Sequence, residues 1–142
     1  MKRNASAVWQ GSLKDGNGRI STESGVISDA RYGFTSRFEN ESGTNPEELI
    51  AAAHAGCFAM ALSGQLAEAK MTAESIAVNA TVSLDKLDAG WTVTAIHLDV
   101  TAKIPGADAG KFMTAANNAK AGCPISRLLG AAAKITMDAR LG

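Results

Sequence analysis

Large aromatic side chains are scarce in this sequence of 142 residues, which holds four Phe, two Trp and one Tyr. Hydrophobic residues make up 46% of the chain, so a core can form, but abundant Ala and Gly leave few large side chains to fill it. The length suits one domain, and we expect a single domain over residues 1–142. The shortage of large side chains indicates that a partner subunit completes part of the apolar packing.

Net charge is also lacking, because 14 Lys and Arg balance 14 Asp and Glu. A balanced chain has no basic face for nucleic acid and no clustered Lys and Arg for an anionic membrane. Residues 1–4 (MKRN) are not followed by the apolar stretch of a secretory signal. We expect no membrane span, since the apolar runs look shorter than the ~20 residues that crossing requires. The prediction is a cytoplasmic protein without a nucleic-acid or membrane partner.

Cysteine is limited to Cys57 and Cys123. Cytosolic thiols are usually kept reduced, so a permanent disulfide is not expected. A single cysteine is more often a small buried hydrophobic side chain than a reactive group. The surroundings of each cysteine therefore have to decide between packing and chemistry.

Alternating and helical patterns along the chain predict an α+β domain. The sequence 15–18 (DGNG) has the turn chemistry of a β-hairpin. The alternation slips by one residue within the fifth strand, which indicates a β-bulge near Ala95. We expect strands over residues 5–13, 19–23, 32–38, 75–86, 91–102 and 133–141, and helices over residues 49–69, 109–121 and 125–129.

The segment 44–48 (TNPEE) is a strong helix start. Asn45 can cap the helix, Pro46 fits its first turn, and the two glutamates favour the positive end of the helix dipole. Residues 49–69 (LIAAAHAGCFAMALSGQLAEA) are apolar nearly all round, which predicts a buried helix. A sheet can cover one side of this helix and a second subunit another, which indicates a homodimer.

His54 and Cys57 lie three residues apart on this helix and so share a face. Four interpretations remain: core packing, metal ligation by both cysteines with His54 and His97, a Cys–His hydrolase or transferase with His54 as base, and redox chemistry between the cysteines. Structural zinc usually shows a paired Cys-x-x-Cys motif, which is missing here. No residue that would orient the imidazole of a hydrolase is evident in the sequence.

Cys123 favours the redox interpretation. It lies in the helix-breaking sequence Gly122-Cys123-Pro124, directly before a new helix, where helix N-terminal charge favours a thiolate. A helix break also gives the mobility that forming a disulfide requires. The cysteines are 66 positions apart, so only the fold can bring them together. From the residues alone, packing and redox chemistry both stay open.

Seven segments of the chain carry a family resemblance. They are residues 21–26 (STESGV), 32–34 (YGF), 37–38 (RF), 43–49 (GTNPEEL), 51–58 (AAAHAGCF), 83–86 (SLDK) and 119–126 (AKAGCPIS). Together they resemble the osmotically inducible protein C (OsmC) family, whose relatives are the organic hydroperoxide resistance proteins. The resemblance covers essentially the whole chain, and the two cysteine motifs in this order are specific. His54 and the YGF segment resemble the OsmC branch.

This resemblance implies an OsmC-like α+β homodimer whose antiparallel sheets wrap around two central buried helices, with active sites at the subunit interface. It implies reduction of organic hydroperoxides by cysteine, without a metal, haem or flavin cofactor. By resemblance, Cys57 attacks the peroxide, and Cys123 resolves the sulfenic acid to a disulfide that an external dithiol reduces. Arg37 and Glu47 match the family's active-site arginine and glutamate, and Arg19 is a weaker candidate for the arginine.

These residue types suit that chemistry. Attack on a peroxide needs a thiolate, and a guanidinium stays charged and can stabilise both the thiolate and the peroxide oxygens. A carboxylate can hold the guanidinium in place. Apolar lining would favour organic peroxides, and we expect it from Phe58, Met60, Ile125 and Leu128. The alternative function is a non-enzymatic dimer that binds a small molecule or lipid and has structural cysteines.

One geometric limit follows from helix rise. Glu47 and Cys57 are ten residues apart, which is ~15 Å along a straight helix. We therefore expect either that Arg37 bridges them or that the helix kinks near Gly56.

Overall fold

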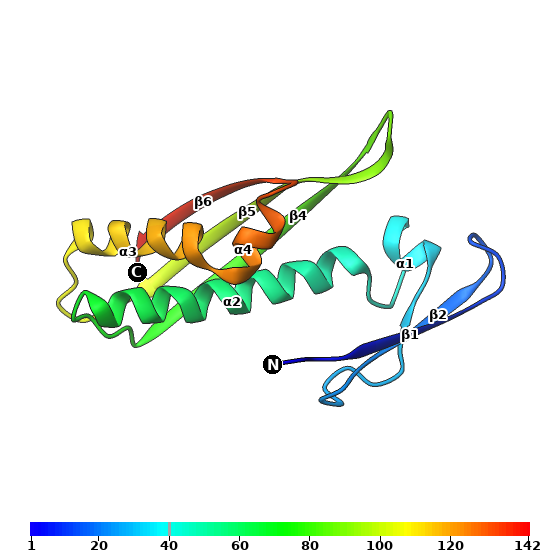
Figure 1. Ribbon diagram of the computed structural model, residues 1–142, viewed down its shortest axis with the longest axis horizontal. Coiled ribbons are helices and arrows are strands. Elements are labelled where there is room, and N and C mark those ends of the chain that lie inside the picture. The colour runs from blue at the N-terminus through cyan, green and yellow to red at the C-terminus, as the bar shows by residue number, and fades with distance from the viewer. Residues whose placement is uncertain (40) are drawn as a thin grey trace. The chain divides into compact units, whose positions relative to one another are not determined.

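The computed structural model describes residues 1–39 and 41–142, and Figure 1 labels most of their helices and strands. These residues form two compact units, Met1–Leu49 and Ile50–Gly142. The elements are β1 (Ala5–Gln10), β2 (Asn17–Thr22), β3 (Ala30–Tyr32), α1 (Phe34–Phe38), α2 (Pro46–Glu68), β4 (Ser75–Leu87), β5 (Gly90–Lys103), α3 (Ala109–Gly122), α4 (Pro124–Leu129) and β6 (Lys134–Leu141). That all 142 residues make one domain stays a prediction.

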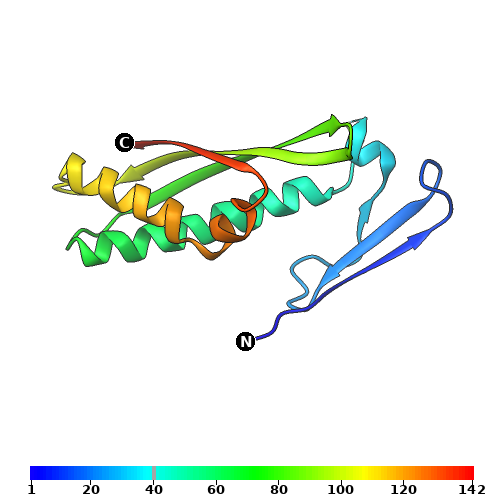
Figure 2. The same ribbon diagram turned by 45° about the horizontal axis from the view of Figure 1, so that its top comes forward.

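The first unit contains an antiparallel sheet in the order β1-β2-β3. Its β1–β2 hairpin, which the sequence predicts, is visible in Figure 2. Gly18 lies in β2 against the Tyr32 ring, where an added Cβ would come within 2.3 Å of the ring. The absence of a side chain at Gly18 therefore lets Tyr32 pack flat on the sheet.

A strand over residues 32–38 is not formed, and that expectation is wrong. After β3 the chain turns into the short helix α1. The Ser36 hydroxyl accepts a hydrogen bond from the Gly33 amide at 2.9 Å and lies 3.0 Å from the Thr44 carbonyl. Such bonds between a serine side chain and nearby backbone compete with strand pairing. Arg37 consequently lies on a helix.

Helix α2 begins as the sequence predicts. The Asn45 side chain accepts a hydrogen bond from the Glu48 amide at 2.8 Å, and Pro46 is the first helical residue. The helix continues without interruption past Gly56 to Glu68. Its buried side chains recur every four residues and form one face: His54, Phe58, Leu62 and Leu66.

Helix α2 is also long and apolar enough, by length and composition, to cross a membrane. The expectation that no apolar run approaches that length is therefore wrong. A core helix passes the same test, and Phe58, Leu62 and Leu66 of α2 belong to the main hydrophobic cluster of the fold. Length alone is thus weak support for a membrane span.

The second unit has a sheet in the order β4-β5-β6. Strands β4 and β5 pair antiparallel, and the register shifts where Ser83 pairs with Ala95 but Leu84 pairs with Val93. This irregularity confirms the bulge expected near Ala95. Strand β6 runs parallel to β5, so this sheet is mixed and not purely antiparallel. The connection through α3 and α4 is long enough to return the chain in the same direction.

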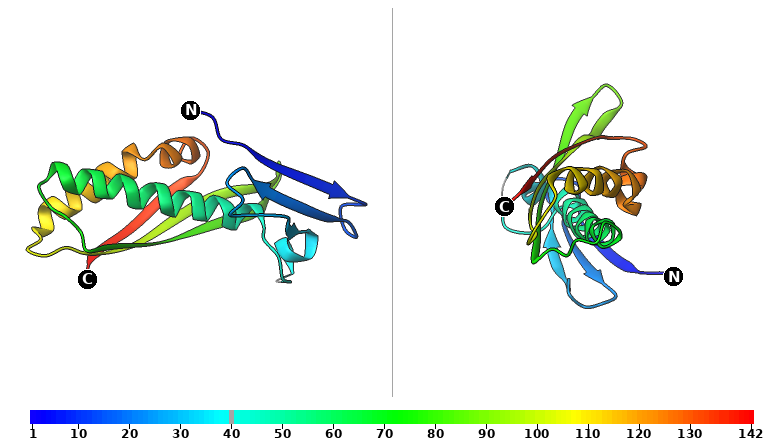
Figure 3. Two further views of the ribbon diagram at one scale, coloured as in Figure 1. Left: turned by 90° about the horizontal axis from the view of Figure 1, so that it is seen from below. Right: turned by 90° about the vertical axis from the view of Figure 1, so that its left-hand side faces the viewer.

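Helices α2 and α3 lie on the same face of this sheet (Figures 1 and 3). Helix α3 covers the helix expected over residues 109–121 and starts after an Asp108 cap, whose carboxylate is 2.8 Å from the Lys111 amide. The inward residues of β5 alternate with outward ones, so His97 lies on the face opposite the core. The core joins α2, β5 and α3 through Phe58, Leu62, Leu66, Leu98, Val100, Ala102, Phe112, Ala115, Ala116 and Ala119.

Candidate active site

The two cysteines meet in the second unit. Cys57 lies midway along α2, and Cys123 lies at the junction where α3 ends and α4 begins. Their sulfur atoms are 2.8 Å apart, and both thiols are free. Cys123 is fully buried, whereas Cys57 is partly exposed. A disulfide of ~2.05 Å needs only a small approach of the two sulfurs.

The surroundings set the two thiols apart. Burial raises the pKa of Cys57 above its ordinary value, and the Cys123 sulfur adds to this rise more than the Ile125 amide offsets it. Burial acts in the same direction on Cys123, but the neighbouring Cys57, Ser126 and the Ile125 amide together lower the Cys123 pKa. Cys57 and the polar groups at the start of α4 therefore favour a thiolate at Cys123.

His54 does not face Cys57 as a base would. Its Nε2 lies 2.7 Å from the hydroxyl oxygen of Ser126, and both side chains are buried. Burial lowers the pKa of His54, so the ring is neutral at neutral pH. Within the part of the chain that the structure describes, Nδ1 of His54 has no hydrogen-bond partner.

Arg37 and Glu47, which the family resemblance implies to be active-site residues, form an ion pair in the first unit. Arg37 Nη2 is 2.7 Å from Glu47 Oε1, and its Nε is 3.2 and 3.1 Å from the two carboxylate oxygens. This two-pronged arrangement fixes the guanidinium plane. Arg19, the weaker candidate, is half exposed and contacts Asp29 on the neighbouring turn.

An apolar pocket of about 320 Å³ adjoins Arg37 in the first unit. The guanidinium carbon lies 5.3 Å from the centre of the Phe38 ring, within the range of a cation–π contact. The pocket is lined by Trp9, Leu13, Tyr32, Gly33, Phe34, Arg37, Phe38 and Pro46. Of the side chains expected to line a pocket, Phe58 is buried in the core instead, while Met60 and Leu128 are exposed.

The structure of helix α2 decides between the two alternatives expected for Glu47 and Cys57. Both lie on α2, which continues as a helix through Gly56. Ten residues of helix separate them by ~15 Å along its axis. Helix α2 therefore does not break near Gly56, and a bridge by Arg37 stays a prediction.

Residues 39–138 match the family model described as "OsmC-like protein". The match covers more than half of the chain. The chain belongs to the OsmC-like protein family.

Individual relatives agree with this membership. "Peroxiredoxin OsmC" of Escherichia coli (strain K12) is 54% identical over 135 residues, which cover 95% of this chain and 93% of the relative. The organic hydroperoxide resistance protein OhrB of Bacillus subtilis shares the fold with a TM-score of 0.72 at 24% identity, covering 96% of this chain and 98% of that one. An OsmC-like protein from Mycoplasma pneumoniae has a TM-score of 0.78 at 15% identity, with coverage of 99% and 97%.

Ser126 and the amide of Ile125 were not among the site residues expected for this OsmC-like protein. Both belong to the first turn of α4, and both act to lower the pKa of Cys123. Their role could have been inferred from the position of Cys123 directly before Pro124, because the first-turn amides of a helix lack partners within that helix. The aromatic pocket beside Arg37 was also missed, because its residues are scattered from Trp9 to Pro46.

The alternative of a metal site involved both cysteines and both histidines. Among residues 1–39 and 41–142, no group of three or more His, Cys, Asp or Glu side chains is placed to hold a metal ion. His97 instead contacts Thr136 at 2.8 Å and Asp138 at 3.5 Å on the outer face of the sheet.

Proposed function

We propose that this OsmC-like protein is a thiol peroxidase that reduces organic hydroperoxides to alcohols. The observation that carries the proposal is the pair of free thiols 2.8 Å apart, one partly exposed and the other fully buried. The names of its relatives, "Peroxiredoxin OsmC" and "Organic Hydroperoxide Resistance Protein OhrB", support the same activity.

Cys57 is the attacking residue, because its sulfur is the one that solvent and substrate can approach. Its thiolate forms a bond to one peroxide oxygen while the O–O bond breaks, and the departing alkoxide takes a proton to become an alcohol. Cys57 is left as a sulfenic acid. The Cys123 thiolate then attacks the Cys57 sulfur and expels hydroxide, which leaves as water after taking a proton. An external dithiol reduces the resulting disulfide.

The thiolate at Cys57 needs support from outside its immediate surroundings. Burial and Cys123 both raise the pKa of Cys57, and the Ile125 amide does not compensate for them. A guanidinium beside the sulfur would favour the thiolate. We assign this role to Arg37, held by Glu47, and place the Arg37–Glu47 pair of one subunit at the cysteine pair of the other.

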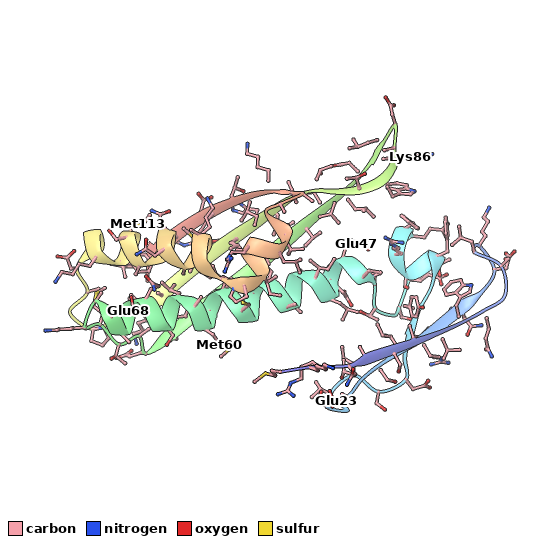
Figure 4. The ribbon with its side chains drawn as sticks, viewed as in Figure 1. Glu23, Glu47, Met60, Glu68, Lys86 and Met113 are labelled. Atoms are coloured by element: carbon pink, nitrogen blue, oxygen red, sulfur yellow. The ribbon has the colours of Figure 1, made fainter. Side chains whose placement is uncertain are left out.

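The homodimer rests on the face of α2 that the chain leaves uncovered. Met60 is 78% exposed and extends from the side of α2 that faces away from α3 (Figure 4). A Cβ added at Gly56 or Gly64 would meet nothing within 4 Å. Exposed apolar surface of this kind marks an interface. The exposed residues of this face are Ala52, Ala53, Gly56, Met60, Ser63, Gly64 and Ala67.

The cytoplasm is the compartment that we propose, because turnover requires a reducing environment. A cytoplasmic dithiol would return both cysteines to thiols after each cycle. The absence of a nucleic-acid or membrane partner stays a prediction from composition.

Cumene hydroperoxide consumption in the presence of dithiothreitol tests the function. The wild type is expected to turn over, Cys57→Ser to be inactive, and Cys123→Ser to react once and then stall. Mass spectrometry after one equivalent of hydroperoxide should show sulfenic or sulfinic acid on Cys57 in the Cys123→Ser protein. Oxidation of Cys123 in Cys57→Ser at a comparable rate would mean that the two roles are reversed.

A further inference from the structure

The buried His54–Ser126 pair has no part in the attack on peroxide, yet it adjoins the cysteine that resolves the intermediate. His54 is 0% exposed and Ser126 is 4% exposed. Ser126 lies three residues after Cys123, in the first turn of α4, and both its hydroxyl and its amide act to lower the pKa of Cys123. His54 and Ser126 are 72 positions apart, and the His54 Nε2 lies 2.7 Å from the Ser126 hydroxyl, so the contact depends on the tertiary fold.

The direction of the hydrogen bonds follows from proton counting. A serine hydroxyl has one proton, so Ser126 donates either to His54 or to Cys123. If Ser126 donated to Nε2, the neutral imidazole would carry its proton on Nδ1, which has no partner in the described part of the chain. The other tautomer leaves Nδ1 as an acceptor without a donor, and buried N–H groups without an acceptor are rarer in proteins than acceptors without a donor. The proton is therefore favoured on Nε2, where it is donated to the Ser126 oxygen.

We propose that His54 is a positioning residue that turns the Ser126 hydroxyl toward Cys123 and so assists both formation and reduction of the Cys57–Cys123 disulfide. In this arrangement, which deepens the proposed function and rests on it, Nε2–H of His54 donates to Ser126, and Ser126 donates to the Cys123 sulfur. Successive hydrogen bonds of one direction reinforce one another.

The arrangement acts on two steps. When Cys123 attacks the sulfenic acid, the Ser126 hydrogen bond keeps more of Cys123 as thiolate. When an external thiolate attacks the disulfide, it reaches Cys57, since Cys123 is fully buried. A bond then forms between the external sulfur and Cys57, and the bond to Cys123 breaks. Cys123 departs as a thiolate that accepts the Ser126 proton in a hydrogen bond, and a more acidic thiol leaves faster. The second thiol of the dithiol then releases Cys57.

Other titratable groups near the His54–Ser126–Cys123 series come from each element packed around it. Cys57 lies on α2, Lys120 on α3 and Lys134 on β6, and the two lysines line a pocket of about 440 Å³ that Ser126 also lines. Both lysines are cations and favour a thiolate by charge, whereas the His54–Ser126 pair acts by orienting the Ser126 hydroxyl. The two effects can be separated experimentally, because a neutral hydrogen-bond donor in place of His54 preserves the orientation of the hydroxyl and adds no charge.

The test begins from a disulfide prepared with diamide and reduced by dithiothreitol over a range of pH. Ser126→Ala and His54→Phe remove the directed donor, whereas His54→Gln keeps an amide N–H near the position of Nε2. In reduction Cys123 is the leaving group, so we expect Ser126→Ala and His54→Phe to slow this step and His54→Gln to restore its rate. In disulfide formation Cys123 is the attacking thiol, and a rise of one unit in its pKa lowers its thiolate fraction about tenfold but raises its intrinsic nucleophilicity about threefold, a net loss of about threefold.

A second arm follows disulfide formation after one equivalent of cumene hydroperoxide, by alkylation and mass spectrometry. Ser126→Ala and His54→Phe should form the Cys57 sulfenic acid at the wild-type rate but convert it to disulfide more slowly, with the pH midpoint moved upward. In nitrogen NMR, the neutral His54 ring should carry its proton on Nε2. His97→Phe is the matched control, because His97 also contacts a hydroxyl but on the outer face of the sheet.

Wild-type rates in Ser126→Ala, equal slowing by His54→Gln and His54→Phe, or a proton on Nδ1 would each overturn the proposal. Thermal unfolding identifies any variant that does not fold. If His54→Phe does not fold, Ser126→Ala still tests the proposal, because it removes only one oxygen. A wild type that does not consume hydroperoxide would refute the peroxidase function, yet the diamide arm would still decide the role of His54.

Discussion

Cys57 and Cys123 touch, but their sulfurs have different surroundings. Cys57 and the first turn of α4 lower the pKa of Cys123, while burial and the neighbouring sulfur raise the pKa of Cys57. A resolving cysteine benefits from an acidic thiol inside its own subunit. An attacking cysteine with a raised pKa depends on a cation that arrives from elsewhere, and Arg37 is the candidate with a rigid carboxylate partner.

Arg37→Ala is expected to raise the pKa of Cys57 and to lower the peroxidase rate far more than the free energy of unfolding. A shift of one pKa unit corresponds to about 1.4 kcal/mol. Arg37→Lys should rescue the rate only in part, because an ammonium lacks the planar fork that grips Glu47. Thiolate absorbance of Cys57 against pH, with Cys123 replaced by Ser in every protein, measures the shift.

Arg19→Ala is the matched control for Arg37→Ala, since Arg19 is half exposed and contacts Asp29. It should leave the Cys57 titration where it is in the wild type. Superimposed curves for Arg37→Ala and the wild type, with equal peroxide reactivity, would remove Arg37 from the mechanism. A shift in Arg19→Ala would promote Arg19 in its place.

His54 should make stability fall on the acid side of neutrality. Burial holds its pKa below the ordinary value of 6.5 in the folded protein, while the unfolded chain titrates near 6.5. Below that pH the unfolded state binds a proton that the folded state does not, so the free energy of unfolding declines as pH falls. The contribution of His54 to the free energy of unfolding is complete above that pH. Urea unfolding between about pH 5 and pH 8 should show a shallower decline in His54→Gln. His97→Gln, at a partly exposed position, should retain the wild-type decline.

At the scale of elements, two helix starts depend on one side chain each. Asn45 accepts from the Glu48 amide and Asp108 from the Lys111 amide, both at 2.8 Å. Asn45→Ala and Asp108→Ala should each lower the free energy of unfolding by about 1 kcal/mol, because an amide at the helix start loses its acceptor. Denaturant unfolding at one protein concentration measures the loss. Asn45→Asp, which keeps an acceptor oxygen, should restore most of it, and an equal loss in Asn45→Asp would contradict the capping role.

For the whole molecule, an active site shared between subunits predicts complementation. A mixture of Arg37→Ala and Cys57→Ser proteins, each inactive alone, forms heterodimers in which one site combines an intact Cys57 with an intact Arg37. Random mixing should recover about a quarter of the wild-type sites in a two-fold symmetric dimer. Peroxidase assays after unfolding and refolding the mixture together measure the recovery.

No recovery in that mixture would place both residues of a working site in the same chain, or show that the chain is not a dimer. Light scattering at micromolar concentration separates these outcomes. Met60→Glu puts a charge on the exposed face of α2 and should yield monomers, whereas Leu128→Glu, at another exposed apolar position, should leave the dimer intact.

Elements whose signals are local could be predicted from the sequence. The Asn45 and Asp108 caps, the β1–β2 hairpin and the bulge beside Thr94 depend on residues close together along the chain, so a short window contains their cause. The α+β class and the family's two cysteine motifs could be read in the same way. The strand expected over residues 32–38 was wrong because Ser36 bonds to Gly33 and Thr44, and alternation gives no sign of such bonds.

The contacts between groups far apart in the sequence depend on tertiary packing. The sulfurs of Cys57 and Cys123 are brought to 2.8 Å, and His54 to 2.7 Å from Ser126, by packing α2 and the α3–α4 junction together. The parallel pairing of β6 likewise depends on where the α3–α4 crossover returns the chain. Contacts between residues so far apart depend on the packing of whole elements, and sequence periodicity records which face of an element is apolar but not which partner covers it.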